Sequence, residues 1–272
     1  MLEAIEAITN AFFGMQVRVP LRAIHCGPDK IWGYETFKEY LAAIGRGKLF
    51  LPPKTDYPLR IRLSQEWHEV LDKMRTESQD GIERHRIIGA NGSQRGLYLS
   101  AISSRGRVGY VPAEVIINSI ERARDAGINA LGDLHSHPKV LNKRRFGELH
   151  RLFRLFKAGL SAGDLYCMLR KESYMPVMGV VEGEENVFAF RTRETSVLEG
   201  ISAYLTQDAF EKYWYEQHGF LYLGKIEALG GFRAIPITST ADSRRVQMGI
   251  AERHNLVLYR GYMGKDLVRL NE

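Results

Sequence analysis

The alternation of hydrophobic and polar residues predicts an α/β fold, because two different periods follow one another along the chain. A period of two is typical of strands, and apolar residues at i, i+3, i+4 and i+7 are typical of helices. Strands are predicted over residues 16–24, 59–63, 82–90, 97–103, 107–111, 128–135, 165–170, 177–181, 187–191 and 256–259. Helices are predicted over residues 2–13, 36–44, 65–74, 112–127, 204–215 and 241–254.

Turn residues divide this pattern into three regions. The pair Pro52-Pro53 with Pro58 predicts an extended connector, and Asn91-Gly92 is a strong hairpin signal between two strands. From residue 57 to 192, strands and helices follow in an order that predicts a mixed β-sheet flanked by helices, in one α/β (α+β) domain. Residues 1–56 are then an N-terminal extension and residues 193–272 a C-terminal extension. Neither extension carries recognisable chemistry.

The composition is that of a globular protein, with 272 residues, 44% of them hydrophobic and 26% charged. No stretch approaches the roughly 18 apolar residues of a membrane span, and the first residues lack the basic region of a secretory signal. Cys26 and Cys167 are the only cysteines and form no metal-binding pair. We therefore expect a cytoplasmic protein without a disulfide framework.

The net charge of +6 is concentrated in one segment. Between Lys139 and Lys157 there are seven cations and one acid, so this segment accounts for the whole excess and predicts one local basic element. Apolar residues at helical spacing predict an amphipathic helix in it: Leu149, Leu152, Phe153, Phe156 and Leu160.

Three roles remain open for this basic helix. It could simply pack on the core with a solvated face. It could be a lid or exosite that contacts an acidic substrate or partner through Arg144, Arg145, Arg151 and Arg154. Nucleic-acid binding is a third, weaker alternative, and association with a membrane surface is weaker still.

The strongest chemical signal runs from Gly132 to Asp164. His135 and His137 are two residues apart, so a strand would place both imidazoles on one face, and Pro138 would end that strand. Asp164 can supply a carboxylate, and two imidazoles, one carboxylate and an open position describe a hydrolytic zinc centre. Histidines at this spacing also occur as plain surface residues. Ser161 with Asp164 also fits a helix capping box, which is compatible with a metal site because a helix N-terminus would hold the carboxylate.

The motif His135–Pro138 followed by Ser161–Asp164 resembles the JAMM (MPN+, JAB) family of zinc metallopeptidases, whose pattern is an upstream glutamate, then HxHP, then SxxD. The resemblance covers roughly residues 57–192 and implies a JAMM/cytidine-deaminase-like core. The chain departs from it in one respect. Twenty-two residues separate Pro138 from Ser161, where the family has a short loop, so residues 139–160 are a basic helical insertion.

Carried over to this chain, the resemblance implies His135, His137 and Asp164 as ligands of Zn²⁺, with Ser161 hydrogen-bonding the water or the developing oxyanion. Glu83 is the best match to the general base. The match is imperfect, because Arg86 replaces a small residue and Gly89 falls one position early, so Glu77 is the reserve candidate. The remaining histidines, His85 among them, have no comparable spacing and are expected to be structural or exposed.

These observations predict a zinc-dependent peptidase or isopeptidase that removes or processes a ubiquitin-like protein. We expect a prokaryotic-type enzyme, because the long C-terminal helices of the eukaryotic scaffold subunits are not predicted here. Two alternatives stay open: a non-catalytic binding or scaffold module on the same fold, and a nucleic-acid-associated protein that uses the basic insertion. Retention of both histidines, Asp164 and Ser161 argues against the binding module.

Overall fold

The computed structural model describes residues 17–20, 51, 53–63, 65–90, 96–99, 104–106, 111, 115–116, 118–120, 122, 129–138, 159–170, 176–198, 206–224, 234–238 and 241–271. The helices predicted over 2–13 and 36–44 lie outside these residues, as does most of the insertion, including Arg144, Arg145, Arg151 and Arg154.

A mixed ten-stranded sheet organises the described part of the chain, in the order β1-β4-β3-β6-β7-β8-β11-β12-β2, with β5 paired to β3. The pair β6–β7 is parallel, whereas the other described pairs are antiparallel. The strands are β1 Val17–Pro20, β2 Arg60–Ile61, β3 Arg84–Ala90, β4 Gly96–Leu99, β5 Ser104–Arg105, β6 Asn129–Ser136, β7 Val177–Glu182, β8 Glu185–Phe190, β11 Val257–Tyr262 and β12 Leu267–Arg269. Two further strands, β9 Phe220–Tyr222 and β10 Ala234–Pro236, form a separate pair.

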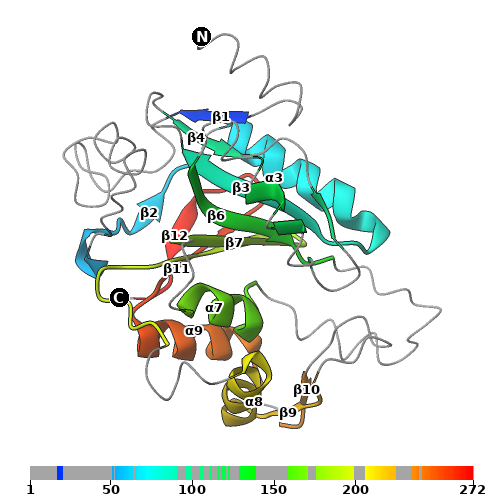
Figure 1. The fold of residues 1–272 in the computed structure, drawn as a ribbon, viewed down its shortest axis with the longest axis vertical. Helices are drawn as coiled ribbons and strands as arrows, with labels where there is room; N and C mark the ends of the chain where they lie inside the picture. The colour runs from blue at the N-terminus through cyan, green and yellow to red at the C-terminus, as the bar shows by residue number, and fades with distance from the viewer. Residues whose placement is uncertain are drawn as a thin grey trace.

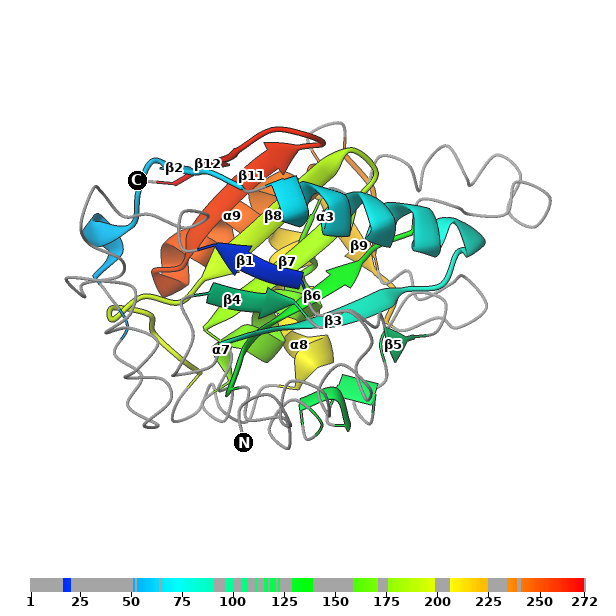
Figure 2. The same ribbon diagram turned by 90° about the horizontal axis from the view of Figure 1, so that it is seen from above.

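Helices cover both faces of this sheet (Figure 1). Helix α3 (Gln65–Glu77) lies across one face, as the view from above shows (Figure 2). Helices α7 (Ala162–Leu169) and α9 (Ser243–His254) lie on the opposite face, and α8 (Gln207–Gln217) packs against both of them. Two short 3-10 turns, Lys54–Asp56 and Ser78–Asp80, flank β2 and α3. The α/β prediction with a mixed sheet flanked by helices is therefore confirmed.

The alternation of the strands assigns each apolar side chain to one of two cores. On the α3 side, Trp67 and Leu71 pack with Leu134 of β6 and Phe188 of β8. On the α7 side, Leu165 packs in a second core, whose other members include Met168, Leu169, Val180, Val187, Ile250 and Leu258. Neighbouring residues of one strand enter opposite cores, so the sheet is buried on both faces. The sequences of its strands are therefore nearly continuous runs of apolar residues.

Segments from both predicted extensions join this same sheet. Strand β1 pairs with β4 at one edge, and β11 pairs with β8 along six residues. Strand β12 then continues the sheet and pairs with β2. The sheet thus runs without interruption from residues near the N-terminus to residues near the C-terminus.

The prediction of a strand over residues 165–170 is wrong, because this segment forms α7. The serine cap at Ser161 starts the helix, and Leu165, Met168 and Leu169 then lie on one buried face at spacings of three and four residues. A short apolar run cannot be assigned to a strand or a buried helix by periodicity alone.

Other predicted elements are found close to their expected places. The hairpin of β3 and β4, the β6 strand that carries the histidines, and the β7–β8 pair with Gly183 in the turn are all present. Helix α3 continues to Glu77, three residues beyond the prediction. The residues described between 115 and 122 are helical, as expected for the helix that follows Pro112.

Candidate metal centre

The end of β6 places the two motif histidines side by side. His135 is in β6 and His137 is just beyond it, and their Nε2 atoms lie 3.1 Å apart. The backbone N–H of His137 donates to the carbonyl of Val181 at 2.9 Å, which continues the pairing with β7 past the end of the strand. Ser136, between the histidines, is fully buried, and its Oγ accepts from the Arg84 N–H at 2.8 Å. The motif is therefore fixed to both neighbouring strands.

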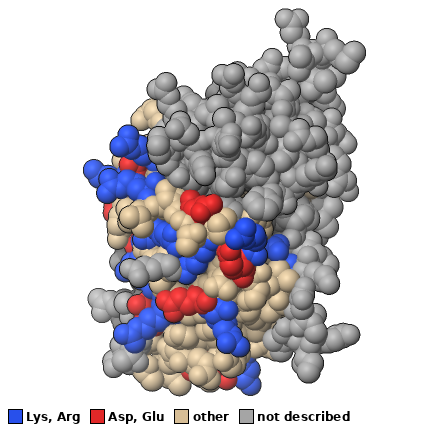
Figure 3. Space-filling view, turned by 90° about the vertical axis from the view of Figure 1, so that its left-hand side faces the viewer, with Lys and Arg blue, Asp and Glu red and all other residues tan. Residues whose placement is uncertain are grey.

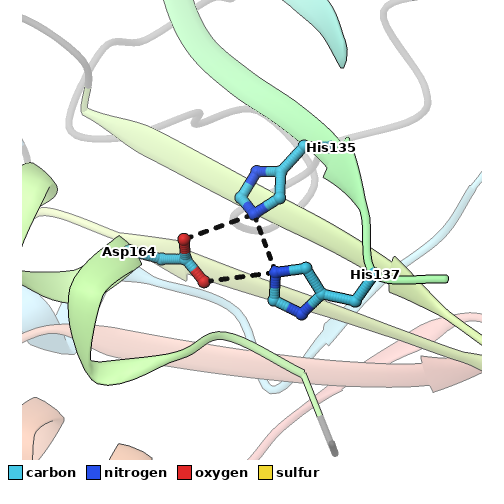
Figure 4. Close-up of side chains that lie close together, drawn as sticks. All are labelled: His135, His137 and Asp164. Carbon is cyan, nitrogen blue, oxygen red and sulfur yellow. Dashed lines mark hydrogen bonds and ion pairs between the residues drawn. The ribbon is translucent and has the colours of Figure 1, made fainter. Parts of the chain in front are cut away.

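Asp164 reaches the histidines from the first turn of α7 (Figure 4). Its Oδ1 lies 3.3 Å from Nε2 of His135, and its Oδ2 lies 3.6 Å from Nε2 of His137. A capping box orients the carboxylate. The Ser161 N–H donates to Oδ2 at 2.6 Å, and Ser161 Oγ accepts from the Asp164 N–H at 3.1 Å. The cap uses Ser161 Oγ as an acceptor, so its proton is left to donate elsewhere.

The two imidazoles and the carboxylate converge at separations that suit zinc. Around a tetrahedral zinc ion with bonds of about 2.0–2.2 Å, neighbouring donor atoms lie about 3.3–3.6 Å apart. The two Nε2 atoms lie 3.1 Å apart, and the two oxygens of Asp164 lie 3.3 Å from Nε2 of His135 and 3.6 Å from Nε2 of His137, which is close to this spacing. The same three residues form the group of possible ligands found within the described part of the chain. Two imidazoles and one carboxylate also match the ligand chemistry of catalytic zinc.

The electrostatics of this group favour a bound cation. Burial alone opposes a charged His135, but the carboxylates of Asp164 and Asp133 outweigh burial and raise its pKa well above the usual value. Burial likewise opposes ionisation of Asp164, but His135 and then His137 outweigh it and lower the pKa of this carboxyl. A carboxylate and ring nitrogens that share one buried place attract either a proton or a metal ion.

A second layer of polar residues lies behind His135. Its Nδ1 lies 2.8 Å from Oδ2 of Asp133, and Oδ1 of the same carboxylate contacts Nε2 of His85. Asp133 and His85 are both buried. Burial opposes ionisation of Asp133, but His85 and His135 outweigh it, so its pKa is lowered.

Glu182, at the end of β7, connects the two halves of the site. It is 1% exposed, and its Oε2 accepts from the Gly159 N–H at 2.9 Å. The same oxygen lies 4.0 Å from Nδ1 of His137. Gly159 stands two residues before the Ser161 cap, so Glu182 fixes the chain where it returns to bring Asp164 to the histidines.

The two candidate bases lie on different sides of the sheet. Glu83 immediately precedes β3 and is buried, and its carbonyl accepts from the Gly106 N–H at 2.9 Å. Glu83 is two residues before His85, and side chains alternate along a strand, so Glu83 is expected on the same face of the sheet as His85. This is also the face of the candidate metal centre. Glu77, at the end of α3, lies 3.4 Å from the Arg86 guanidinium on the opposite face. The arrangement favours Glu83.

Charged side chains of both signs are mixed on one face of the described part of the protein. On the face in Figure 3, lysine and arginine side chains alternate with aspartate and glutamate. Among the described residues we also find no helix with the length and apolar content needed to cross a bilayer.

Comparison with known proteins gives no assignment: the chain matches no protein-family model, and no curated protein matches it.

Sequence reasoning missed the supporting roles of Asp133, His85 and Glu182. The signal for Asp133 was present, because it stands two residues before His135 in a predicted strand and therefore shares its face. The partnership with His85 depends on the register of β3 against β6, and that of Glu182 on the parallel pairing of β6 and β7. Neither register follows from local pattern.

Proposed function

We propose that this protein is a zinc-dependent peptidase or isopeptidase. The observation that carries the proposal is the convergence of His135 Nε2, His137 Nε2 and the Asp164 carboxylate: the two nitrogens lie 3.1 Å apart, and each faces one carboxylate oxygen, at 3.3 and 3.6 Å. These three residues would hold the ion. When bound, zinc lowers the pKa of a water molecule toward ~7 and polarises a carbonyl group.

The residues around the ion supply the proton transfers. The Glu83 carboxylate takes a proton from the attacking water and returns it to the nitrogen of the leaving amine. The Ser161 hydroxyl donates a hydrogen bond to the oxyanion that develops on the substrate carbonyl. Its backbone N–H stays on Asp164, so the cap and the donor can act together.

The resemblance of His135–Pro138 and Ser161–Asp164 to the JAMM motif supports a substrate class. Enzymes of that family cleave ubiquitin or ubiquitin-like proteins from lysine, and their bacterial relatives process ubiquitin-like or sulfur-carrier proteins. We propose a ubiquitin-like protein, or its conjugate, as the substrate here. An acidic partner at the basic insertion is compatible with this substrate.

Two measurements test the proposal in sequence. Mass spectrometry of freshly purified protein should find one zinc per chain, and His137→Ala should lose it. Incubation with ubiquitin-like fusions and lysine-linked conjugates should release the free protein, as seen by intact-mass analysis. No zinc and no uptake of added zinc would refute the metal site. Zinc without cleavage of any conjugate would instead favour a binding module.

Variants of the two glutamates separate the proposed base from its rival. Glu83→Gln should keep zinc and lose hydrolysis, because the amide cannot accept the proton. Glu77→Gln is the matched control and should keep both zinc and hydrolysis. Activity in Glu83→Gln equal to that of the unmodified protein would show that the base is wrongly assigned.

A further inference from the structure

A buried line of three polar side chains crosses from β3 to β6 behind the metal centre. His85 and His135 are directly opposite each other in the antiparallel register, so their side chains share one face. Asp133 is two residues before His135 and lies on that same face. The carboxylate of Asp133 therefore stands between two imidazoles from neighbouring strands.

Each oxygen of Asp133 serves a different ring. Oδ2 lies 2.8 Å from His135 Nδ1, and Oδ1 contacts His85 Nε2. With both oxygens engaged, the carboxylate cannot rotate without losing one contact. A proton on Nδ1 of His135, donated to Oδ2, leaves the Nε2 lone pair directed at His137 and Asp164, which is the form that binds a metal.

His85 is suited to hold this carboxylate in place. Its side chain is fully buried, and its Nε2 lies against Oδ1 of Asp133. Neither ring nitrogen has another hydrogen-bond partner among the described residues. With its proton on Nε2, the ring can donate to the Asp133 carboxylate. A buried carboxylate and two buried imidazoles cost free energy that an apolar core would not.

A different carboxylate faces the other histidine. Oε2 of Glu182 lies 4.0 Å from Nδ1 of His137 and accepts from the Gly159 N–H. The contact of Asp133 with His135 is shorter, at 2.8 Å.

We infer that Asp133, buttressed by His85, is the positioning residue that fixes the tautomer and ring orientation of His135 for metal binding. The inference depends on one part of the proposed function, namely that the site binds a metal ion. It concerns residues outside the HxHP and SxxD motifs, and it assigns His85 a role that its position in the sequence does not suggest.

The test measures metal affinity by competition with a chromogenic chelator, so no substrate is needed. In Asp133→Asn, the amide oxygen can still accept from Nδ1 of His135. The amide NH₂ then faces the N–H of His85, where two donors meet, so this second contact is lost. We expect the zinc affinity to fall about 10–100-fold, the usual effect of removing such a partner. The visible absorption of the Co²⁺-loaded protein should change as well, because it reports the ligand geometry directly.

A matched pair at His85 provides an independent measurement. Gln and Leu are similar in size, but only Gln offers an N–H to Asp133. His85→Gln should therefore keep most of the zinc affinity, whereas His85→Leu should lose it together with the Co²⁺ spectrum of the unmodified protein. Ile87→Val is the packing control, because Ile87 is buried opposite Asp133 in the register and its side chain has no polar atom. Its zinc affinity should be unchanged.

Equal zinc affinity in Asp133→Asn, His85→Leu and the unmodified protein would overturn the inference and leave the metal site standing. Failure of the unmodified protein to bind zinc would overturn both. If Asp133→Asn does not fold by circular dichroism, the comparison of His85→Gln with His85→Leu decides. Equal affinities in that pair count against the inference, and a loss confined to Leu supports it.

Discussion

Glu182 accepts a hydrogen bond from the Gly159 N–H at 2.9 Å, although the two residues are 23 positions apart in the chain. This contact joins the end of β7 to the segment that leads into α7, where Asp164 approaches the two histidines. The candidate metal centre therefore includes a backbone anchor as well as the three side chains that would bind the ion.

Gly159→Ala should weaken this anchor. The residue has φ +88°, and an added Cβ would lie 2.6 Å from Cγ2 of the buried Val187. We expect a loss of stability of about 1–3 kcal/mol from strain and overpacking, and weaker zinc binding because Asp164 is displaced. Urea denaturation and chelator competition measure the two effects.

Gly264→Ala is the control for backbone strain. It has φ +68°, but nothing lies within 4 Å of its added Cβ. It should lose about 1–2 kcal/mol of stability from backbone strain alone and keep the zinc affinity of the unmodified protein. Equal zinc affinity in both glycine variants would show that the anchor does not position Asp164.

Ser161 is expected to combine a structural and a chemical role that substitutions can separate. Ser161→Ala removes the cap of α7 and should cost about 0.5–2 kcal/mol of stability. It should also reduce hydrolysis by about 10²–10³-fold, through loss of the donor to the oxyanion. Ser161→Asn should restore the cap and the stability, because asparagine is an equally good N-cap, without restoring the hydroxyl.

Thr206→Ala provides the matched cap control. Thr206 caps α8 by accepting from the Ala209 N–H at 3.1 Å. Its loss should destabilise the protein by a similar amount and leave hydrolysis unchanged. If Ser161→Asn hydrolyses as well as the unmodified protein, Ser161 acts only as a cap.

Zinc affinity should rise with pH across the neutral range. The pKa of His135 is raised in the metal-free protein, because the carboxylates of Asp164 and Asp133 outweigh the effect of burial. Below that pKa, the ring carries a proton that zinc must displace. Asp164 is already ionised, since its pKa is lowered. We therefore expect about a tenfold gain in affinity per pH unit for the one proton released.

Calorimetry in buffers of different ionisation enthalpy measures this proton directly. The observed binding enthalpy should vary with the buffer in proportion to about one released proton per zinc ion. An affinity and an enthalpy that depend on neither pH nor buffer would contradict the assignment of His135 as a protonated ligand.

Glu77 forms an ion pair with a buried arginine. It lies 3.4 Å from the guanidinium of Arg86, which is 1% exposed. Glu77→Gln should destabilise the protein by about 1–3 kcal/mol, because the buried Arg86 loses a charged partner. A denaturant curve measures the change, and no change would show that this ion pair does not contribute to stability.

The sequence alone was sufficient for much of the fold, because strands buried on one or both faces and capped helices leave strong local patterns. Strand β6, the β3–β4 hairpin and helix α9 were predicted near their observed bounds. The prediction failed at α7, because its short apolar stretch is compatible with a strand or with a buried helix. The Ser161 cap indicates the helix, but the prediction followed the hydrophobicity of the residues after it.

The sequence was sufficient to predict the three candidate ligands but not the residues that support them. His135 and His137 are two residues apart, and Asp164 belongs to a motif with Ser161, so short-range spacing was informative. Asp133 meets His85 only through strand register, and Glu182 meets Gly159 only after the chain returns to the sheet. Such long-range contacts are set by the packing of the whole fold.

The parallel pairing of β6 and β7 has a consequence for how this chain can change. Antiparallel neighbours can be joined by short turns whose length fixes their register, but parallel neighbours require a long crossover that tolerates added residues. The histidines lie at the start of this crossover and Asp164 near its end, with the insertion between them. New sequence can therefore be accommodated beside the metal centre while the sheet and the ligand positions are retained. This connection is the natural place in the fold for specificity to diverge.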